Sequence, residues 1–354
     1  MRYKKWLINC IRILFIIGIV ILLNRIFIPK YSTENQDGRI TREFYQEKTP
    51  IDVLAVGSST VYNAVSPDYL WQEYGFTSYV RANASQTMWQ SYYLLKDALR
   101  TKTPSLVIAD MSFMKYGEEF VEEPSNRKTI EGMRNTLTKY ECIKASMWEE
   151  EQPVTYFFPI FRYHSRWKEL SSADFLQAFS SKEITYDGFL MEFDIPDEQT
   201  VYEMEEQQDY SFPQKAVEYL DKMTKLCSEK NIPLLLMKTP TYVNNWYPEY
   251  DEYLEKYAAV HGIKYQNFDD DKEKMESCLR TDYIDDGSHL NIVGAEKFSK
   301  FLGSYIQENY EIPDRTNDEQ IKKTWDKKAA RYNQDKEEGL KGYKEKLSKL
   351  QLTD

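Results

Sequence analysis

The alternation of strand-like and helix-like runs constrains the fold of this chain most. Strand-like runs occupy residues 51–56, 77–81 and 105–110, with helix-like runs at 67–74 and 87–100 between them. The alternation resumes with helices over 213–230, 248–260 and 292–310 and strands over 232–237 and 263–267. This pattern predicts an α/β domain over residues 51–312, in which helices cover both faces of a parallel sheet of about five strands.

Two regions depart from the alternation. Residues 117–211 predict a large, mostly helical insertion, with helical pieces at 129–150 and 172–179 and an aromatic block at 156–167. Residues 313–354 alternate charges around apolar residues at near-helical spacing, which predicts an amphipathic helix broken or bent near Gly339 and Gly342. The tail can dock on its own domain, on a partner or on a membrane, and docking on its own domain is the favoured interpretation.

The N-terminus predicts a membrane anchor. Residues 6–28 are predominantly apolar and about long enough to cross a bilayer, and Arg2, Lys4 and Lys5 precede them. The sequence lacks a small-residue cleavage motif after this run, which favours an uncleaved signal anchor over residues 1–30; the alternative is a cleaved signal peptide. The early positive charges place the N-terminus in the cytoplasm and the domain outside it. Polar residues 31–50 are expected to form a stalk.

Charge and cysteine content exclude several classes of protein. Removing the six basic residues of the anchor from the formal net charge of −11 leaves −17 for the exported part, which argues against nucleic acid as a partner. Cys142, Cys227 and Cys278 are irregularly spaced and form neither a disulfide framework nor a zinc-ligand pattern. The sequence has no glycine-rich phosphate loop and no histidine–carboxylate spacing typical of a metal site, so we expect neither a metal nor a cofactor.

The candidate chemistry begins where the first strand ends, at Gly57-Ser58-Ser59. The carboxyl ends of parallel strands are where ligands bind in open α/β sheets, and a serine there needs a neighbouring base to become a nucleophile. Of the three histidines, His261 reads as a helix end and His164 as a packed residue of the aromatic block. His289 directly precedes the last core helix, three residues after Asp286, so a turn would allow that carboxylate to orient the imidazole.

These two blocks resemble those of the SGNH/GDSL hydrolase family. The family carries Gly-Asp-Ser, or Gly-Ser-Ser in membrane-anchored members, after its first strand, and Asp-x-x-His before its last helix. Gly57-Ser58-Ser59 and Asp286-Gly287-Ser288-His289 match these blocks. The resemblance covers roughly residues 50–115 and 212–310. It implies a three-layer, flavodoxin-like fold, with Ser59 as nucleophile, His289 as general base and Asp286 as the residue that orients it.

The middle blocks depart from the family pattern. Family members usually present a glycine after the second strand and Gly-x-Asn after the third, which complete the oxyanion hole. Residues 81–86 contain no glycine, and residues 109–112 contain no asparagine. An oxyanion hole needs donors rather than a particular side chain, so the backbone of Ser59, Ala82 or Asn83, or the amide of Asn83, is the expected source.

The membrane anchor and Gly-Ser-Ser together look most like the acyl-transfer branch of this superfamily. That branch includes the D-alanyl transfer protein of teichoic-acid modification and proteins of polysaccharide O-acetylation. The resemblance implies a single-pass cell-membrane esterase or O-acyltransferase acting on a carbohydrate or polyol acceptor, with an integral membrane O-acyltransferase as partner. Arg162, His164, Arg166 and Trp167 of the aromatic block are candidate acceptor-binding residues. The alternative is a catalytically weak scaffold that binds such a partner or a glycan.

Overall fold

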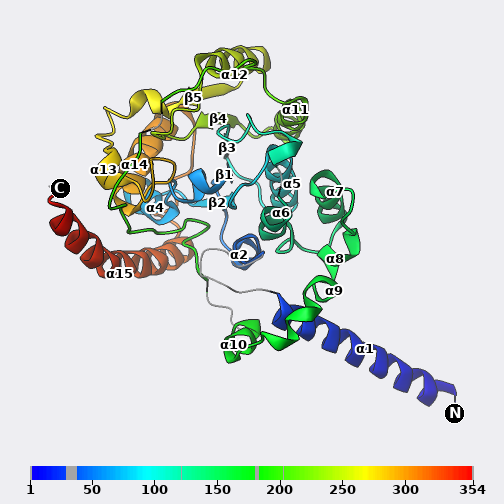
Figure 1. The fold of residues 1–354 in the computed structure, drawn as a ribbon. Helices are drawn as coiled ribbons and strands as arrows, with labels where there is room; N and C mark the ends of the chain where they lie inside the picture. Colours follow the sequence, from blue (N-terminus) through cyan, green and yellow to red (C-terminus); the bar gives the residue numbers. More distant parts are fainter. Residues whose placement is uncertain (1, 29–37, 121, 180–182, 202, 353–354) are drawn as a thin grey trace.

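The chain folds around a five-stranded, all-parallel sheet in the computed structural model (Figure 1), which describes all residues except 1, 29–37, 121, 180–182, 202 and 353–354. The strands are β1 (Val53–Gly57), β2 (Ser78–Ala82), β3 (Leu106–Asp110), β4 (Leu234–Lys238) and β5 (Lys264–Asn267). Their order is β2-β1-β3-β4-β5, as in flavodoxin-like sheets. The predicted α/β class and strand number are confirmed, although most strands begin one or two residues later than expected.

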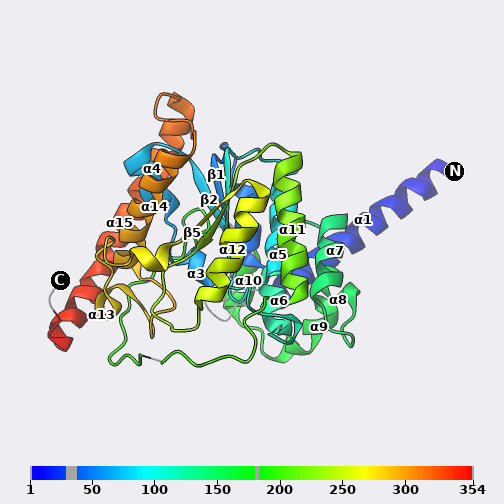
Figure 2. The same cartoon turned by 90° about the horizontal axis from the view of Figure 1, so that it is seen from above.

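Helices cover both faces of the sheet (Figure 2). One face packs against α5 (Met88–Ala98), α11 (Gln214–Glu229) and α12 (Pro248–His261). The other face packs against α4 (Pro67–Tyr74) and α14 (Ile292–Asn309). Alternate residues of β1 serve the two layers, because Leu54 and Val56 point into the first core and Val53 and Ala55 into the second. All five residues of each of β1 to β4 are buried, as expected for strands covered on both sides.

Short helical segments connect these layers. They are α3 (Ser59–Tyr62) after β1, η4 (Phe268–Asp271) after β5 and α13 (Leu279–Asp282) before α14. The register aligns the carboxyl ends of the central strands, because Gly57 of β1 pairs with Ala82 of β2 and Asp110 of β3 pairs with Met237 of β4. The polar residues that follow these strands therefore gather at one edge of the sheet.

The insertion is helical in its first half. It contains η2 (Glu118–Phe120), α6 (Glu123–Ile130), α7 (Leu137–Ser146), α8 (Pro153–Phe157), α9 (Ile160–Tyr163), η3 (His164–Lys168) and α10 (Ser172–Phe179). The described residues between 183 and 212 form neither helix nor strand. They run back across the domain, where Val80 donates its N–H to Asp187 and Ile292 donates its N–H to Glu192.

The N-terminal helix α1 (Arg2–Phe27) projects away from the domain (Figure 1). Its segment Tyr3–Phe27 is long and apolar enough to cross a membrane, and no residue of its most apolar stretch is buried, whereas Ile26 at the domain end is buried. The prediction that residues 31–50 form a stalk is wrong for residues 39–46. Residues 31–37 lie outside the described part of the chain. Residues 39–46 form α2 (Arg39–Glu43) and η1 (Phe44–Gln46), and Phe44 is buried beneath the Arg81 guanidinium, 4.2 Å from the ring centre. Apolar Ile40 and Phe44 make this segment part of the core.

The C-terminal tail forms one continuous helix, α15 (Glu319–Leu350), docked on its own domain. Trp325 and Tyr332 are fully buried, and the Trp325 ring lies 5.7 Å from that of Trp71 in α4. The break expected near Gly339 and Gly342 is absent. A Cβ at Gly339 would lie 2.2 Å from the ring of Phe193, so this glycine permits close packing within an intact helix.

Candidate active site

Ser59 is presented by a sharp turn between β1 and α3. The strand ends at Gly57, Ser58 is extended, and Ser59 is the first residue of the helical turn. A Cβ at Gly57 would lie 2.5 Å from Val61 Cγ2 and 2.9 Å from Asp110 Cβ, so only glycine allows the strand to turn this closely. Ser59 is 9% exposed, which leaves its hydroxyl at the surface of a largely buried turn.

Ser59, His289 and Asp285 form a hydrogen-bonded chain. The Ser59 Oγ lies 2.7 Å from Nε2 of His289, and Nδ1 of His289 lies 2.5 Å from Oδ2 of Asp285. A carboxylate only accepts hydrogen bonds, so the imidazole donates from Nδ1 to Asp285 and accepts the Ser59 hydroxyl proton at Nε2. This is the geometry of a nucleophile, a base and a group that orients the base.

Asp285 owes its position to a tight loop between Tyr283 and Leu290, which pair as an isolated antiparallel bridge. Its Oδ1 accepts the backbone N–H groups of Gly287, Ser288 and His289 at 3.0, 2.7 and 3.1 Å. Burial acts to raise the pKa of Asp285, but the hydrogen bonds and charge of His289 outweigh it, and the pKa is lowered. The carboxylate is therefore held ionised against the imidazole.

The expectation that Asp286 orients His289 is corrected by this loop. Asp286 Oδ1 instead accepts the backbone N–H of Thr200 at 2.8 Å, which fastens the end of the insertion to the loop. Gly287 adopts φ 106°, and the turn that it makes brings the His289 ring over the residue four positions earlier rather than three. Family spacing pointed to Asp286, and the carboxylate directly before it, Asp285, was not considered.

Asp110, at the end of β3, forms hydrogen bonds with residues that follow β1, β3 and β4, close to Ser59. Its carboxylate accepts hydrogen bonds from Thr60 Oγ1 at 3.2 Å, from Ser112 Oγ at 2.8 Å and from Thr239 N and Oγ1 at 3.1 and 2.8 Å. The side chain is 2% exposed. Asp110 therefore acts as a structural acceptor and contributes no donor to an oxyanion hole.

A pocket of about 200 Å³ opens beside Ser59 and His289. Its walls come from the loops that follow the strands and include Thr60, Ser85, Ser112, Phe113, Lys115, Tyr116, Lys238, Thr241 and Asn245. Burial first, and then the positive charge of Lys238, lower the pKa of Lys115 to about 7. Lys115 donates to the Asn245 carbonyl at 3.0 Å, and Lys238 is paired with Asp269 at 3.1 Å. The sequence analysis missed both lysines, although Lys238 ends a predicted strand region at the reactive edge.

Of the oxyanion donors expected from the sequence, only Ser59 lies in the lining of this pocket. The amide nitrogen of Asn83 donates to Thr41 Oγ1 at 3.0 Å and to Gln86 Oε1 at 3.2 Å, so both of its hydrogens are engaged inside the protein. Among the described residues of the β2–α5 loop, Ser85 at φ 53° reaches the pocket, whereas Ala82 and Asn83 do not line it. The Ser59 N–H starts α3 and has no intrahelical partner, so it stays a candidate donor.

The aromatic block lies away from this pocket, near the domain end of α1. Arg162 pairs with Glu123, and His164 Nδ1 donates to the carbonyl of Phe161 at 3.1 Å. Arg166 is buried and bonds the carbonyl of Phe27 at the end of α1, while Trp167 is exposed. The described lining of the pocket beside Ser59 includes none of Arg162, His164, Arg166 and Trp167. Their expected role in acceptor binding beside Ser59 is therefore wrong for this pocket.

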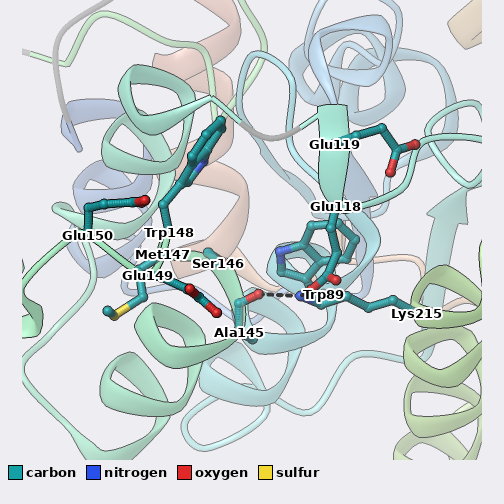
Figure 3. Close-up of a pocket in the computed structure, with 10 residues that line it drawn as sticks. All are labelled: Trp89, Glu118, Glu119, Ala145, Ser146, Met147, Trp148, Glu149, Glu150 and Lys215. Atoms are coloured by element: carbon teal, nitrogen blue, oxygen red, sulfur yellow. Dashed lines mark hydrogen bonds and ion pairs between the residues drawn. The ribbon is translucent and has the colours of Figure 1, made fainter.

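A second, larger pocket of about 470 Å³ lies between η2, α7 and the start of α11 (Figure 3). Trp89, Trp148, Lys215 and four glutamates, Glu118, Glu119, Glu149 and Glu150, line it. Lys215 pairs with Glu118 and donates to the Ala145 carbonyl at 2.7 Å. Phe113, Lys115 and Tyr116 line the pocket beside Ser59, and Glu118 and Glu119 line this one, so the segment after β3 separates the two.

Across the described part of the chain, no group of three or more His, Cys, Asp or Glu side chains is placed to hold a metal ion. No protein-family model matches the chain, and no curated protein sequence matches it.

Proposed function

We propose that this protein is a serine esterase or O-acyltransferase that works through an acyl-enzyme on Ser59. The observation that supports this most directly is the hydrogen-bonded chain from Ser59 Oγ to His289 Nε2 and from Nδ1 to Asp285. These three side chains come from two loops 230 positions apart in the sequence, at the strand edge where α/β folds bind ligands. The agreement of the site with the Gly-Ser-Ser and C-terminal histidine blocks supports membership of the SGNH superfamily.

The geometry suits a two-step acyl transfer. His289 Nε2 takes the hydroxyl proton as Ser59 Oγ attacks the ester carbonyl, and the resulting imidazolium is stabilised by Asp285. Collapse of the tetrahedral intermediate expels the alcohol, which receives that proton from His289. A second hydroxyl, from water or an acceptor, then loses its proton to His289, attacks the acyl-enzyme and releases Ser59.

The acceptor class proposed is a carbohydrate or polyol of the cell envelope. The pocket beside Ser59 is small, and its serine, threonine, asparagine and lysine side chains can hydrogen-bond to hydroxyls, while Phe113, Tyr116 and Val243 give it apolar walls against which a sugar or polyol can pack. The N-terminal helix supports placement at the outer face of the cell membrane. An integral membrane O-acyltransferase that supplies the acyl group is the proposed partner.

Labelling with a fluorophosphonate tests the nucleophile. We expect wild type to be labelled and Ser59→Ala to lose labelling, with Ser58→Ala as the matched control because Ser58 is fully buried and bonded to Thr60. Labelling of Ser59→Ala at the wild-type level would contradict the assignment of Ser59 as the nucleophile. Comparing release of acid from an activated acetyl ester with and without a glycan acceptor then separates transfer from hydrolysis.

The alternative is an SGNH-like scaffold without useful catalysis. The engaged amide of Asn83 favours it, because each oxyanion donor missing from a hole costs about 10²- to 10³-fold in rate. An absence of both labelling and ester turnover in correctly folded wild-type protein would support the scaffold.

A further inference from the structure

We infer that exposed apolar side chains of the insertion insert into the outer interface of the bilayer that α1 crosses, and so fix the domain against the membrane. We call this set the collar. It consists of Phe158, Phe161, Trp167, Phe175, Leu176 and Phe179. The inference rests on α1 being a membrane anchor and is independent of the chemistry of Ser59.

The collar is attached to the end of α1 by hydrogen bonds. The N–H of Ile160 donates to the side-chain oxygen of Asn24 at 2.9 Å, and the Arg166 guanidinium donates to the carbonyl of Phe27 at 2.6 Å. Arg166 is held in turn by Asp174 of α10 at 3.1 Å. Helices α9 and α10 also pack against α1, and Figure 1 shows both at its domain end. The collar and the last turn of α1 therefore form one unit.

The length of α1 sets the depth at which the collar and the last turn of α1 lie in the membrane. Its 26 residues span roughly 39 Å at 1.5 Å per residue, a little more than the ~30 Å of a bilayer core. Arg2, Lys4 and Lys5 hold the other end at the cytoplasmic surface. Asn24 and Phe27 consequently reach the outer interface, and the side chains bonded to them lie at the level of the lipid headgroups.

Helix α10 buries an acidic side chain and exposes apolar ones, which is the reverse of a helix on the surface of a soluble protein. Asp174 and Ala178 are the buried residues, whereas Phe175, Leu176 and Phe179 are 48%, 74% and 69% exposed. Burying the acid and exposing the apolar residues is unfavourable in water but favourable against lipid. Phe158, Phe161 and Trp167, at 42%, 59% and 64% exposed, extend the apolar surface towards α1.

The composition of the collar also favours lipid over another protein as the occupant. Aromatic rings with adjacent cations are typical of membrane interfaces, and Lys168 Nζ lies 5.3 Å from the Trp167 ring centre. A lipid surface needs no shape complementarity, whereas a protein partner does. The position of the collar beside a membrane helix makes lipid the first surface that it meets.

Single-cysteine fluorescence in the full chain tests this inference. In a Cys10→Ala, Cys278→Ala background, with buried Cys142 and Cys227 retained, Leu176→Cys or Phe179→Cys carries an environment-sensitive fluorophore. The protein is placed, one chain per disc, in nanodiscs of phosphatidylcholine and phosphatidylglycerol with or without 5-doxyl lipid. The matched control is Val260→Cys on α12, which is 81% exposed. Ile16→Cys within α1 reports on the anchor itself.

We expect blue-shifted emission and several-fold stronger doxyl quenching at positions 176 and 179 than at position 260, with strong quenching at position 16. If the fluorophores at positions 176 and 179 were quenched no more than the one at position 260, the inference would be wrong, even if quenching at position 16 showed that α1 lies in the bilayer. Blue-shifted emission at 176 and 179 without doxyl quenching would assign the surface to a protein partner and also overturn the inference. Activity is not measured, so the outcome is separate from that of the Ser59 tests.

Discussion

One carboxylate holds both the backbone and the side chain of His289: Asp285 Oδ1 accepts the His289 N–H at 3.1 Å, while Oδ2 lies 2.5 Å from Nδ1 of the same residue. The imidazole therefore has its position and its tautomer set by a single group. Loss of this carboxylate removes both constraints at once.

Substitution of Asp285 is expected to be far more damaging than substitution of Asp286. In triads, loss of the orienting carboxylate costs about 10⁴-fold in kcat because the imidazole adopts the wrong tautomer. We expect Asp285→Asn to lose about 10³- to 10⁴-fold in ester turnover and Asp286→Asn less than about tenfold, since Asp286 contacts Thr200 instead. Steady-state kinetics on an activated ester measure both, and equal losses would contradict the assignment.

Lys115 is expected to make stability depend on pH. Its pKa is about 7 in the folded protein against 10.5 for an ordinary lysine, so between these values the unfolded chain binds more protons. The free energy of unfolding should therefore rise with pH from about 7 towards 10.5 through this residue. Lys115→Met should abolish this part of the rise, which thermal melting of the detergent-solubilised chain at pH 7 and pH 9.5 measures. An unchanged pH dependence in the variant would contradict the prediction.

Gly57→Ala tests the close approach at the end of β1. The added methyl group would overlap Val61 and Asp110, at 2.5 and 2.9 Å from the nearest carbon atoms. Overpacking of this kind typically costs about 1 to 3 kcal/mol. We expect a lower melting temperature together with reduced turnover, because the displaced turn carries Ser59. Gly262→Ala is a comparison variant at an uncrowded glycine with positive φ, and it should lower stability while turnover stays near the wild-type value.

Trp325→Ala tests the docking of the C-terminal helix. The Trp325 side chain is fully buried, contacts Trp71 and donates from Nε1 to Thr49 Oγ1 at 3.0 Å. Removal of a buried tryptophan typically costs about 3 to 5 kcal/mol. Trp167→Ala, which removes an exposed ring, should change the free energy of unfolding in detergent by less than about 0.5 kcal/mol. Denaturant unfolding of both variants gives the comparison.

Sequence patterns predicted the parts of the fold where local chemistry and burial agree. Helix α4 begins at Pro67 after Ser66, whose hydroxyl caps the Tyr69 N–H, and it was predicted to the residue. Strands β1, β3 and β4 were predicted because both faces of the sheet are covered there and their residues are almost all apolar, whereas the polar, partly exposed β5 was recognised from its place in the alternation. Ser59 and His289 were recognised because each stands beside a strand or helix boundary that the sequence marks clearly.

The parts that sequence did not predict depend on contacts between distant segments. Choosing Asp285 over Asp286 requires the turn at Gly287, and burying Phe44 requires Arg81 from a strand 37 positions later. The aromatic block has the composition of a ligand site. Its position is set by Asn24 and Phe27 of α1, which no local pattern in residues 156–167 encodes.

Ion pairs and hydrogen bonds join residues 315–328 to residues 47–52 just before β1, and these contacts have a consequence for the order of folding. Lys328 of α15 bonds Glu47 and Asp187, Arg315 bonds Asp52 at 2.6 Å, and Trp325 bonds Thr49. Residues 47–52 thus have contact partners, residues 315–328, that come far later in the sequence. A folding chain can form these contacts only once residues up to Lys328 are available, so Glu47 and Asp52 lack these cationic partners until then.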